Sequence, residues 1–156
     1  MSETRDTQRE TRNHDVAELA RLDAWKLSDD LAFEVFKLSR HLPNDLRWLS
    51  TQALRAATSV PANIAEGYSR SSKREFLQFL SIARGSLTEL EYYLHFLRRS
   101  ELIDQQTYDG LTELRRRAGQ TLFGLMRSLR ASLPPKKAGR QTQLRELEEE
   151  YVVEMD

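Results

Sequence analysis

The chain has 156 residues, no cysteine, only 6 glycines and 4 prolines, and 24 basic against 24 acidic side chains. This length suits one domain with its own hydrophobic core, and a composition rich in leucine, alanine, glutamate and arginine favours long helices over strands. The lack of cysteine excludes a disulfide framework, a thiol nucleophile and a thiolate metal site. No stretch approaches the roughly 20 apolar residues of a membrane span. We therefore expect an all-α, cytoplasmic protein with no membrane partner.

The charge is balanced overall but unevenly placed. Residues 1–23 carry 4 basic and 6 acidic side chains, residues 24–133 carry 16 and 12, and residues 134–156 carry 4 and 6. Residues 1–14 show no aromatic side chain and no apolar period, which predicts a disordered arm. Residues 15–133 form the predicted domain. Residues 134–156 are a predicted linker and acidic tail, where Leu144, Leu147 and Tyr151 indicate a short helix or a flexible segment.

Two helices are predicted in the first half of the domain. Leucine and valine at positions 27, 31, 35, 38 and 42 follow steps of four and three, which predicts a helix over residues 15–41 that Pro43 ends. A second stripe at positions 46, 49, 53, 56, 60 and 64 follows an asparagine or aspartate cap at position 44 or 45. Pro61 lies inside this stripe and predicts a kink near Thr58. Gly67 is the expected stop.

The second half of the domain carries the strongest period. Ser72 and Glu75 have the spacing of a capping box, and apolar residues at positions 76, 80, 83, 87, 90, 94 and 97 repeat as a heptad seam, which predicts a helix over residues 73–99. Asp104 is the expected cap of a fourth helix, with a stripe at positions 111, 114, 118, 122, 125 and 129 and an end at the proline pair 134–135. Four helices joined by short links predict an up-down-up-down antiparallel four-helix bundle.

Two segments resemble a known family. The run SVPANIAEGYSR at residues 59–70, followed by REFLQFLSIARGSLTEL at residues 74–90, resembles the four-helix bundle proteins encoded by intervening sequences of bacterial 23S ribosomal RNA genes. The resemblance covers about residues 22–130 and includes Trp25. Family members often have two adjacent arginines after the glutamine of the second helix, whereas this chain has Gln52-Ala53-Leu54-Arg55.

The resemblance implies a bundle that assembles into a ring, commonly a homopentamer, with a role in nucleic-acid binding and without catalytic activity. The accessory proteins of diversity-generating retroelements, which bind RNA and a reverse transcriptase, are more distant relatives whose sequences diverge from the NIAEG pattern. The expected partners are therefore further copies of the chain, RNA or DNA, and, more distantly, a reverse transcriptase.

Four polar residues in and near the matched motifs are predicted to form a structural network: Arg55, Asn63, Glu66 and Arg84. A carboxylate held between arginines would fix how the second and third helices dock. The functional alternative is that Glu66 acts as a general acid or base. Gly85 and Ser86 lie in the middle of a predicted helix, where glycine costs about 1 kcal/mol relative to alanine, and close helix packing explains them better than a ligand site.

No constellation in the sequence indicates catalysis, a metal or a cofactor. His14, His41 and His95 lack the i, i+4 pairing and the nearby carboxylate of a metal site. Neither a nucleophile elbow nor a glycine-rich phosphate loop is present. We therefore expect a protein that is not an enzyme.

Basic side chains form three groups on the predicted helices. The predicted nucleic-acid-binding residues are Arg70, Lys73 and Arg74, then Arg98 and Arg99, then Arg115, Arg116 and Arg117. In a ring each group is repeated around the axis, so a modest charge per chain becomes a continuous basic belt. Tyr68 beside Arg70 is suited to stack on an unpaired base. A solvated face without a ligand is the alternative.

Five aromatic residues exceed what single helix stripes can bury: Phe33, Phe36, Tyr92, Tyr93 and Phe96. We expect them to pack against a neighbouring copy, with extra core around Trp25 as the alternative. The sequence thus predicts a non-catalytic oligomeric bundle that binds nucleic acid through arginines. The alternative function is a protein–protein adaptor, such as an accessory subunit of a reverse transcriptase. Its acidic tail would then bind the partner or cover the basic surface.

Overall fold

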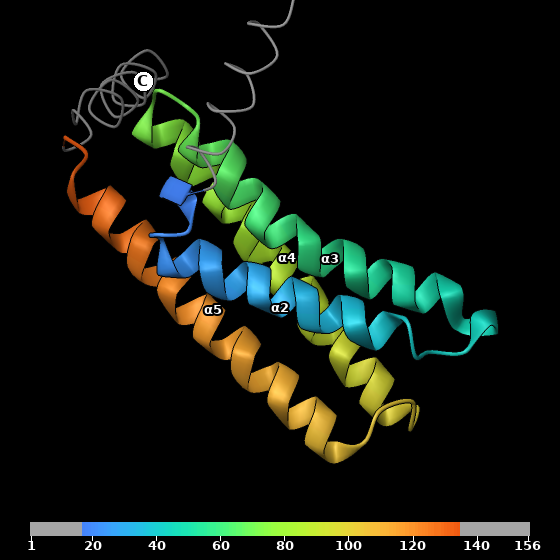
Figure 1. The fold of residues 1–156 in the computed structure, drawn as a ribbon. Helices are drawn as coiled ribbons and strands as arrows, with labels where there is room; N and C mark the ends of the chain where they lie inside the picture. The colour runs from blue at the N-terminus through green and yellow to red at the C-terminus, as the bar shows by residue number, and fades with distance from the viewer. Residues whose placement is uncertain (1–16, 135–156) are drawn as a thin grey trace, which may run out of the picture.

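The structure, a computed structural model, describes residues 17–134 and shows a bundle of antiparallel helices (Figure 1). The elements are α2 (Asp23–Ser39), a short 3-10 helix η1 (Asn44–Leu46), α3 (Arg47–Tyr68), α4 (Lys73–Arg99) and α5 (Gln105–Ala131). Each long helix packs against its neighbours in sequence, and α2 also packs against α5. This arrangement closes the predicted up-down-up-down bundle, and residues 17–134 contain no strand. The arm predicted over residues 1–14, and the predicted tail beyond Pro134, lie outside the described residues.

The core consists of the predicted apolar stripes. Every heptad position of α4 is buried, namely Phe76, Leu80, Ala83, Leu87, Leu90, Leu94 and Leu97. The facing stripe of α3 is small and alanine-rich, with Ala53, Ala56 and Ala57 almost inaccessible. Small side chains let two helix backbones approach closely, and α3 packs more extensively against α4 than against any other element.

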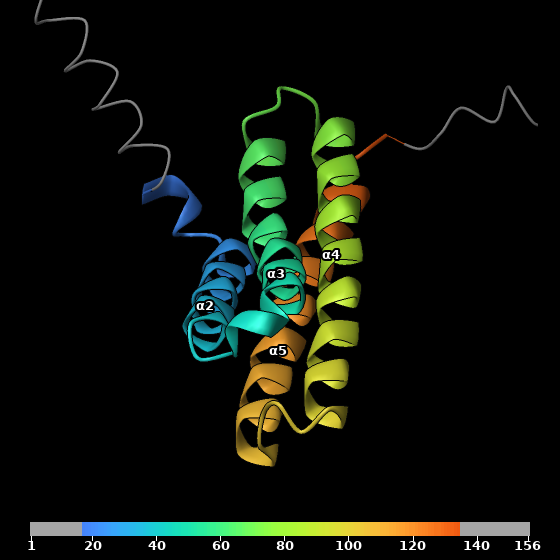
Figure 2. The ribbon, with the colours of Figure 1, turned by 90° about the vertical axis from the view of Figure 1, so that its right-hand side faces the viewer.

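Pro61 lies inside α3 without ending it. The helix continues from Arg47 to Tyr68, and the ribbon in Figure 2 changes direction near its middle, in agreement with the predicted kink. Proline has no N–H to donate and crowds the preceding turn, which explains a bend at this position. Thr58 donates from Oγ1 to the Leu54 carbonyl at 2.9 Å in the same region.

Gly67 lies inside the last turn of α3 and does not stop the helix. The helix ends one residue later, at Tyr68, and no glycine of the described chain has a positive φ. A Cβ at Gly67 would lie 2.6 Å from Phe76 Cδ2 and 2.7 Å from Phe79 Cβ. The prediction of a C-terminal stop was therefore wrong, because this glycine is required by the close approach of α4.

The starts of α2 and α3 also differ from the prediction. Residues 17–19 form a separate helical turn, and α2 begins only at Asp23, because Leu22 is extended at φ −87° and ψ 110°. Neither Asn44 nor Asp45 caps α3, since both lie in η1 and no side-chain bond caps the helix start. The chain thus enters α3 through a 3-10 turn, which apolar periodicity does not distinguish from an α-helix.

The starts of α4 and α5 agree with the prediction in position. Ser72 is the N-cap residue of α4, although its side chain makes no capping bond. Asp104 caps α5, and its Oδ1 accepts a hydrogen bond from the Thr107 backbone N–H at 2.7 Å. None of the helices in residues 17–134 is long and apolar enough to cross a membrane.

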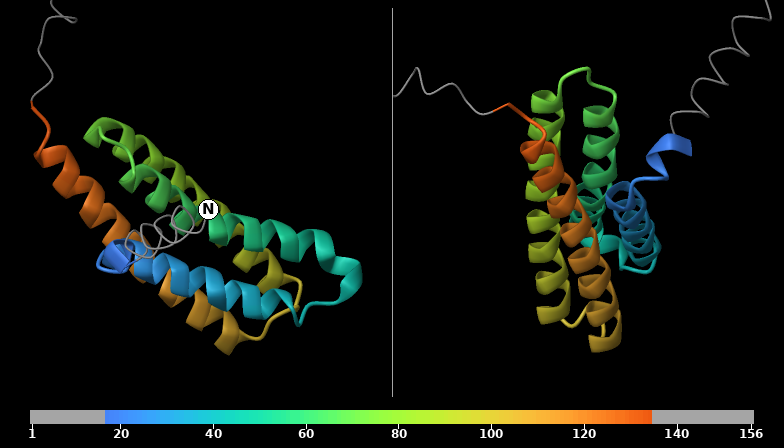
Figure 3. Two further views of the ribbon diagram at one scale, coloured as in Figure 1. Left: turned by 45° about the horizontal axis from the view of Figure 1, so that its top comes forward. Right: turned by 90° about the vertical axis from the view of Figure 1, so that its left-hand side faces the viewer.

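The antiparallel arrangement gives the bundle two distinct ends. The start of α2, the turn between α3 and α4, and the end of α5 lie at one end, named here the terminal end (Figure 3). Pro134 follows three residues after the last residue of α5. The turns between α2 and α3 and between α4 and α5 lie at the other, named here the opposite end.

Candidate nucleic-acid interface

The four residues predicted to form one polar network do not form it. Glu66 accepts a hydrogen bond from Arg70 Nη2 at 2.6 Å, one turn later in the same helix. Arg55 lies 3.8 Å from Glu89 of α4, and Arg84 has no ion-pair partner within residues 17–134. Arg55 and Glu66 share a face of α3 but lie three turns apart, about 16 Å, so one carboxylate cannot join them.

A smaller polar contact connects α3 to α4 instead. The buried Ser86 donates from Oγ to Ser59 Oγ at 2.9 Å. Asn63 donates from Nδ2 to the Ser59 carbonyl at 2.7 Å and to Ser59 Oγ at 3.0 Å. Of the predicted network only Asn63 takes part. The two serines are hard to select from sequence because helical serines most often bond their own backbone.

Gly85 faces away from this contact. A Cβ at Gly85 would have no heavy atom within 4 Å. Close packing inside the bundle was predicted for both Gly85 and Ser86. It explains the buried Ser86 but not Gly85. Nothing in residues 17–134 requires a glycine at this position.

The first of the three consecutive arginines of α5 is part of the packed structure. The side chain of Arg115 is 20 % exposed and forms an ion pair with Glu91 of α4. Its Nε also donates to the Leu87 carbonyl at 3.2 Å. Arg115 therefore joins α4 to α5, and its charge is already compensated.

The other two arginines differ from each other. Arg116 forms two hydrogen bonds of 2.7 Å with Glu113, one turn earlier. This paired bond lowers the pKa of Glu113 and raises the pKa of Arg116. Arg117 has no ion-pair partner within the described chain. Arg117 is thus the member of this group without a directly bonded carboxylate in the described chain.

Two arginines that the sequence prediction omitted, Arg127 and Arg130, lie with the first predicted group at the terminal end. Lys73 Nζ donates to Ser132 Oγ at 3.1 Å, which places the start of α4 against the end of α5. The cations of this end within residues 17–134 are Arg21, Arg70, Lys73, Arg74, Arg127 and Arg130. The acidic side chains there are Glu18, Asp23, Glu66 and Glu75. An antiparallel bundle places the end of the fourth helix beside the start of the third. Basic residues near the end of the fourth helix are therefore the signal that could have found Arg127 and Arg130.

Arg98 and Arg99 lie at the opposite end, one full length of α4 away. The helix has 27 residues, so these arginines are about 40 Å from Lys73 and Arg74. Arg98 donates from Nε to Gln105 Oε1 at 2.9 Å. The three predicted basic groups therefore do not form one patch on a single chain.

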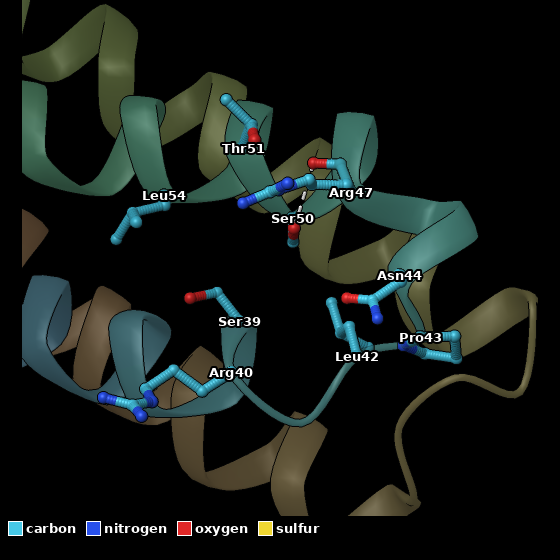
Figure 4. Close-up of a pocket in the computed structure, with 9 residues that line it drawn as sticks. All are labelled: Ser39, Arg40, Leu42, Pro43, Asn44, Arg47, Ser50, Thr51 and Leu54. Atoms are coloured by element: carbon cyan, nitrogen blue, oxygen red, sulfur yellow. Dashed lines mark hydrogen bonds between the residues drawn. The ribbon is translucent and has the colours of Figure 1, made fainter.

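A shallow hollow at the opposite end lies between α2 and α3 (Figure 4). Its volume is about 320 Å³, and Arg40 and Arg47 flank it from different helices. Arg40 also lies over the ring of Phe36, 5.8 Å from its centroid. No carboxylate is among its lining residues, so the hollow is a second basic site on the surface.

Four of the exposed aromatic side chains lie in two separate groups, the second of which also contains the partly buried Phe96. The α2 aromatic pair consists of Phe33 and Phe36, whose ring centroids are 6.1 Å apart. The α3–α4 aromatic cluster consists of Trp48, Tyr92 and Phe96, with centroid distances of 6.5 Å and 6.2 Å to Phe96. Phe33, Trp48 and Tyr92 are each more than half exposed. Trp48 was missed because it lies between positions 46 and 49 of the apolar stripe and not on it.

The comparison with known families decides the identity of the bundle. A family model described as 23S rRNA-intervening sequence protein matches residues 20–124. The chain belongs to this family. Among solved structures, it is similar to a protein of unknown function from the S23 ribosomal protein family of Bacteroides thetaiotaomicron, with 28% sequence identity and a TM-score of 0.62 over 66% of this chain and 97% of that chain. No curated protein matches.

For this member of the 23S rRNA-intervening sequence family, the structure separates the two motifs into inward and outward residues. Ile64, Gly67, Ala83 and Ser86 are buried. Glu66, Arg84 and Gly85 face solvent. The packing of α3 on α4 explains the buried motif residues. The outward half is not explained by the bundle alone.

Proposed function

We propose that this member of the family is a non-catalytic oligomeric bundle whose terminal end binds the phosphate backbone of RNA or DNA. The observation that supports it is the gathering of six cations from three separate parts of the chain at that end. Lys73, Arg74 and Arg130 have no ion-pair partner within the described residues. Lysine and arginine contacts to phosphate supply affinity without selecting a base sequence.

The sequence just beyond the described bundle adds to this basic end. Residues 135–140 carry Lys136, Lys137 and Arg140 and no acidic side chain. They follow directly after Pro134, three residues beyond the end of α5 at the terminal end. We propose that these cations add further contacts to phosphate.

The two aromatic groups support oligomerisation. Lys37 and Arg40 lie over the rings of the α2 aromatic pair, at 5.4 Å and 5.8 Å from the centroids. Lys37 is also paired with Glu34, so Arg40 supplies the positive charge of this apolar surface. Glu89 and Glu91, shortly before Tyr92 on α4, are paired with Arg55 and Arg115, so the surface around the α3–α4 aromatic cluster is mainly apolar. Two different exposed aromatic surfaces favour head-to-tail association, which forms a ring when the rotation between copies closes. A homopentamer is the ring that the family resemblance implies.

Gly85 lies on the same face of α4 as the α3–α4 aromatic cluster. It lies two turns before Tyr92 on the same face of α4, since seven residues correspond to almost two full turns. An exposed helical glycine costs about 1 kcal/mol relative to alanine, and a closely approaching neighbouring chain gives a reason to keep it.

The experiment is a binding titration with structured RNA, single-stranded RNA and duplex DNA at about 50 and 200 mM salt. The test variant is Lys73→Glu/Arg74→Glu/Arg130→Glu at the terminal end. The matched control, Arg47→Glu/Arg98→Glu/Arg99→Glu, reverses the same number of charges at the opposite end. We expect the test variant to lose at least about tenfold in affinity and to show a weaker salt dependence, and the control to bind nearly as the wild type does.

Two results would contradict this proposal. One is equal binding by the test and control variants, which would remove the terminal end as the site. The other is the absence of salt-dependent binding to all three nucleic acids, which would favour the second candidate. That candidate is a protein–protein adaptor, and the exposed Trp48 and Tyr92 favour it, because exposed aromatic clusters mark surfaces that bind protein.

A further inference from the structure

A groove runs along the seam between α2 and α5, which lie side by side in Figure 1. Three hollows of about 220, 490 and 830 Å³ follow one another along it. The first and second share Asp23 and Thr121 as lining residues, and the second and third share Leu114. The hollows therefore form one continuous groove.

The floor of the groove is apolar and only partly covered. Its leucines are Leu22, Leu27, Leu38, Leu111, Leu114 and Leu125. All of them except Leu111 remain partly accessible in the described chain. From Gln106 to Leu125 the groove follows about 29 Å of α5. An elongated apolar groove with polar rims is the form that binds an amphipathic helix.

The acidic tail contains a segment that fits this groove. Leu144, Leu147, Tyr151 and Met155 are spaced by three, four and four residues, which in a helix places them on one stripe. As a helix, residues 141–156 would be about 24 Å long, close to the length of the groove. Residues 1–16 cannot fill it in the same way, because Met1 and Val16 are their only large apolar side chains.

The chain also leaves the described bundle at the correct end. Pro134 follows the end of α5 at the terminal end, where Leu22 and Leu125 line the first hollow. Leu125 is nine residues before Pro134, about 14 Å back along α5, whereas the ten residues from Pro134 to Leu144 can span about 33 Å. The tail can therefore enter the groove at this end and run toward Leu111.

The charges on the rims favour a defined register. Lys26 and Arg117 stand on the α2 and α5 sides of the middle hollow, and neither has an ion-pair partner within residues 17–134. On a tail helix, Glu148 and Glu150 flank the apolar stripe on its two sides and can meet these cations. Two aspartates of α2 share the same rim, so the leucine floor, and not net charge, dominates the affinity.

We propose that residues 141–156 dock as an amphipathic helix in the α2–α5 groove of their own chain. Docking covers the accessible leucines and places acidic side chains next to Arg117. The groove borders both other surfaces, because Arg21 of the terminal end lines its first hollow and Lys37 beside the α2 aromatic pair lines its third, but its leucine floor belongs to neither.

The test uses the full chain, whose lack of native cysteine lets engineered pairs report proximity. Asp30 lines the groove and its neighbour Asp29 does not, which makes them a matched pair. Glu148→Cys and, separately, Glu150→Cys are each combined with Asp30→Cys or with the control Asp29→Cys. Under mild oxidation we expect at least about tenfold faster disulfide formation within the monomer for an Asp30→Cys pair than for the matching Asp29→Cys pair.

A second pair of variants tests the apolar stripe. Leu147→Asp, on the stripe, should abolish the rate difference, whereas Val153→Asp, on the far side of the helix, should preserve it. Equal rates for the Asp29→Cys and Asp30→Cys pairs would overturn the proposal. Disulfides that form only between chains would also overturn it, because the groove would then hold the tail of a second copy.

Discussion

Gly67 and Gly85 belong to the two matched motifs, yet their surroundings are opposite. Gly67 is enclosed by Phe76 and Phe79, whereas Gly85 has open space where a Cβ would be. The sequence alone could not assign these roles, because both positions are glycines on regular helices. The spatial neighbour that makes one of them necessary lies on another helix.

Alanine substitutions separate the two roles. Gly67→Ala should lower the free energy of unfolding by about 1–3 kcal/mol, because the new methyl overlaps the buried Phe76 ring and the Cβ of Phe79, which the α4 backbone holds in place. Gly85→Ala should raise it by up to about 1 kcal/mol in a dissociated chain, because only helix propensity changes. Urea denaturation followed by circular dichroism measures both, with Gly124→Ala as the control for an open helical site. Equal stability of Gly67→Ala and Gly124→Ala would show that α4 does not approach Gly67 closely.

The helix starts show how far sequence patterns define the elements. The heptad seam predicted α4 over its whole length, because a strong 3.5-residue period leaves little choice of register. The start of α3 was misplaced, because polar residues before an apolar stripe suit a 3-10 turn as well as an N-cap. Asp104 was placed correctly, since its side chain makes the bond that defines a cap.

The Asp104 cap predicts a dependence of stability on pH. The backbone N–H of Thr107, and then its side chain, hold the pKa of Asp104 below its usual value. A carboxyl whose folded-state pKa is lowered stabilises the fold above its unfolded pKa of about 4, and that contribution is lost as pH falls through the lowered value. Asp104→Ala should therefore lower the urea midpoint clearly at about pH 7 and much less at about pH 2. Asp45→Ala, at a carboxyl that caps no helix, is the control, and a pH-independent effect of Asp104→Ala would contradict the prediction.

The packing of α4 on α5 predicts that one arginine is structural. Arg115→Glu places a carboxylate beside Glu91 and removes the side-chain hydrogen bond to the Leu87 carbonyl, so it should destabilise the bundle by about 1–3 kcal/mol. Arg84→Glu, on an exposed face of α4, should change stability by less than about 0.5 kcal/mol. Thermal unfolding distinguishes the two. Equal effects would mean that the Arg115–Glu91 pair contributes nothing to docking.

The sequence was least informative about which surface residues become neighbours in the folded chain. Which aromatic residues remain exposed depends on how four helices are oriented about a common core, and this is why Trp48 was overlooked. The basic groups show the same limit, because Arg127 and Arg130 join Lys73 only through the antiparallel arrangement of α4 and α5. Periodicity defines which face of each helix turns inward, but it does not define which outward faces become neighbours.

The two aromatic surfaces lead to a test of head-to-tail assembly. Trp48→Glu/Tyr92→Glu should lower the molar mass measured by light scattering at micromolar concentration, and so should Phe33→Glu/Phe36→Glu, because each removes one half of the contact. Phe123→Glu replaces an equally exposed aromatic residue outside both surfaces and should leave the assembly intact. Circular dichroism confirms that each variant is folded.

Mixing the two variants gives the sharpest result. Each retains the surface that its partner has lost, so a head-to-tail contact predicts 1:1 dimers in the mixture and monomers in each variant alone. A self-complementary contact predicts no such rescue. A wild-type chain that is monomeric at micromolar concentration would remove the ring, and with it the reason proposed for Gly85. If the ring forms, Gly85→Ala should weaken association although it stabilises the single chain, a reversal of sign that only a neighbouring chain close to α4 can produce.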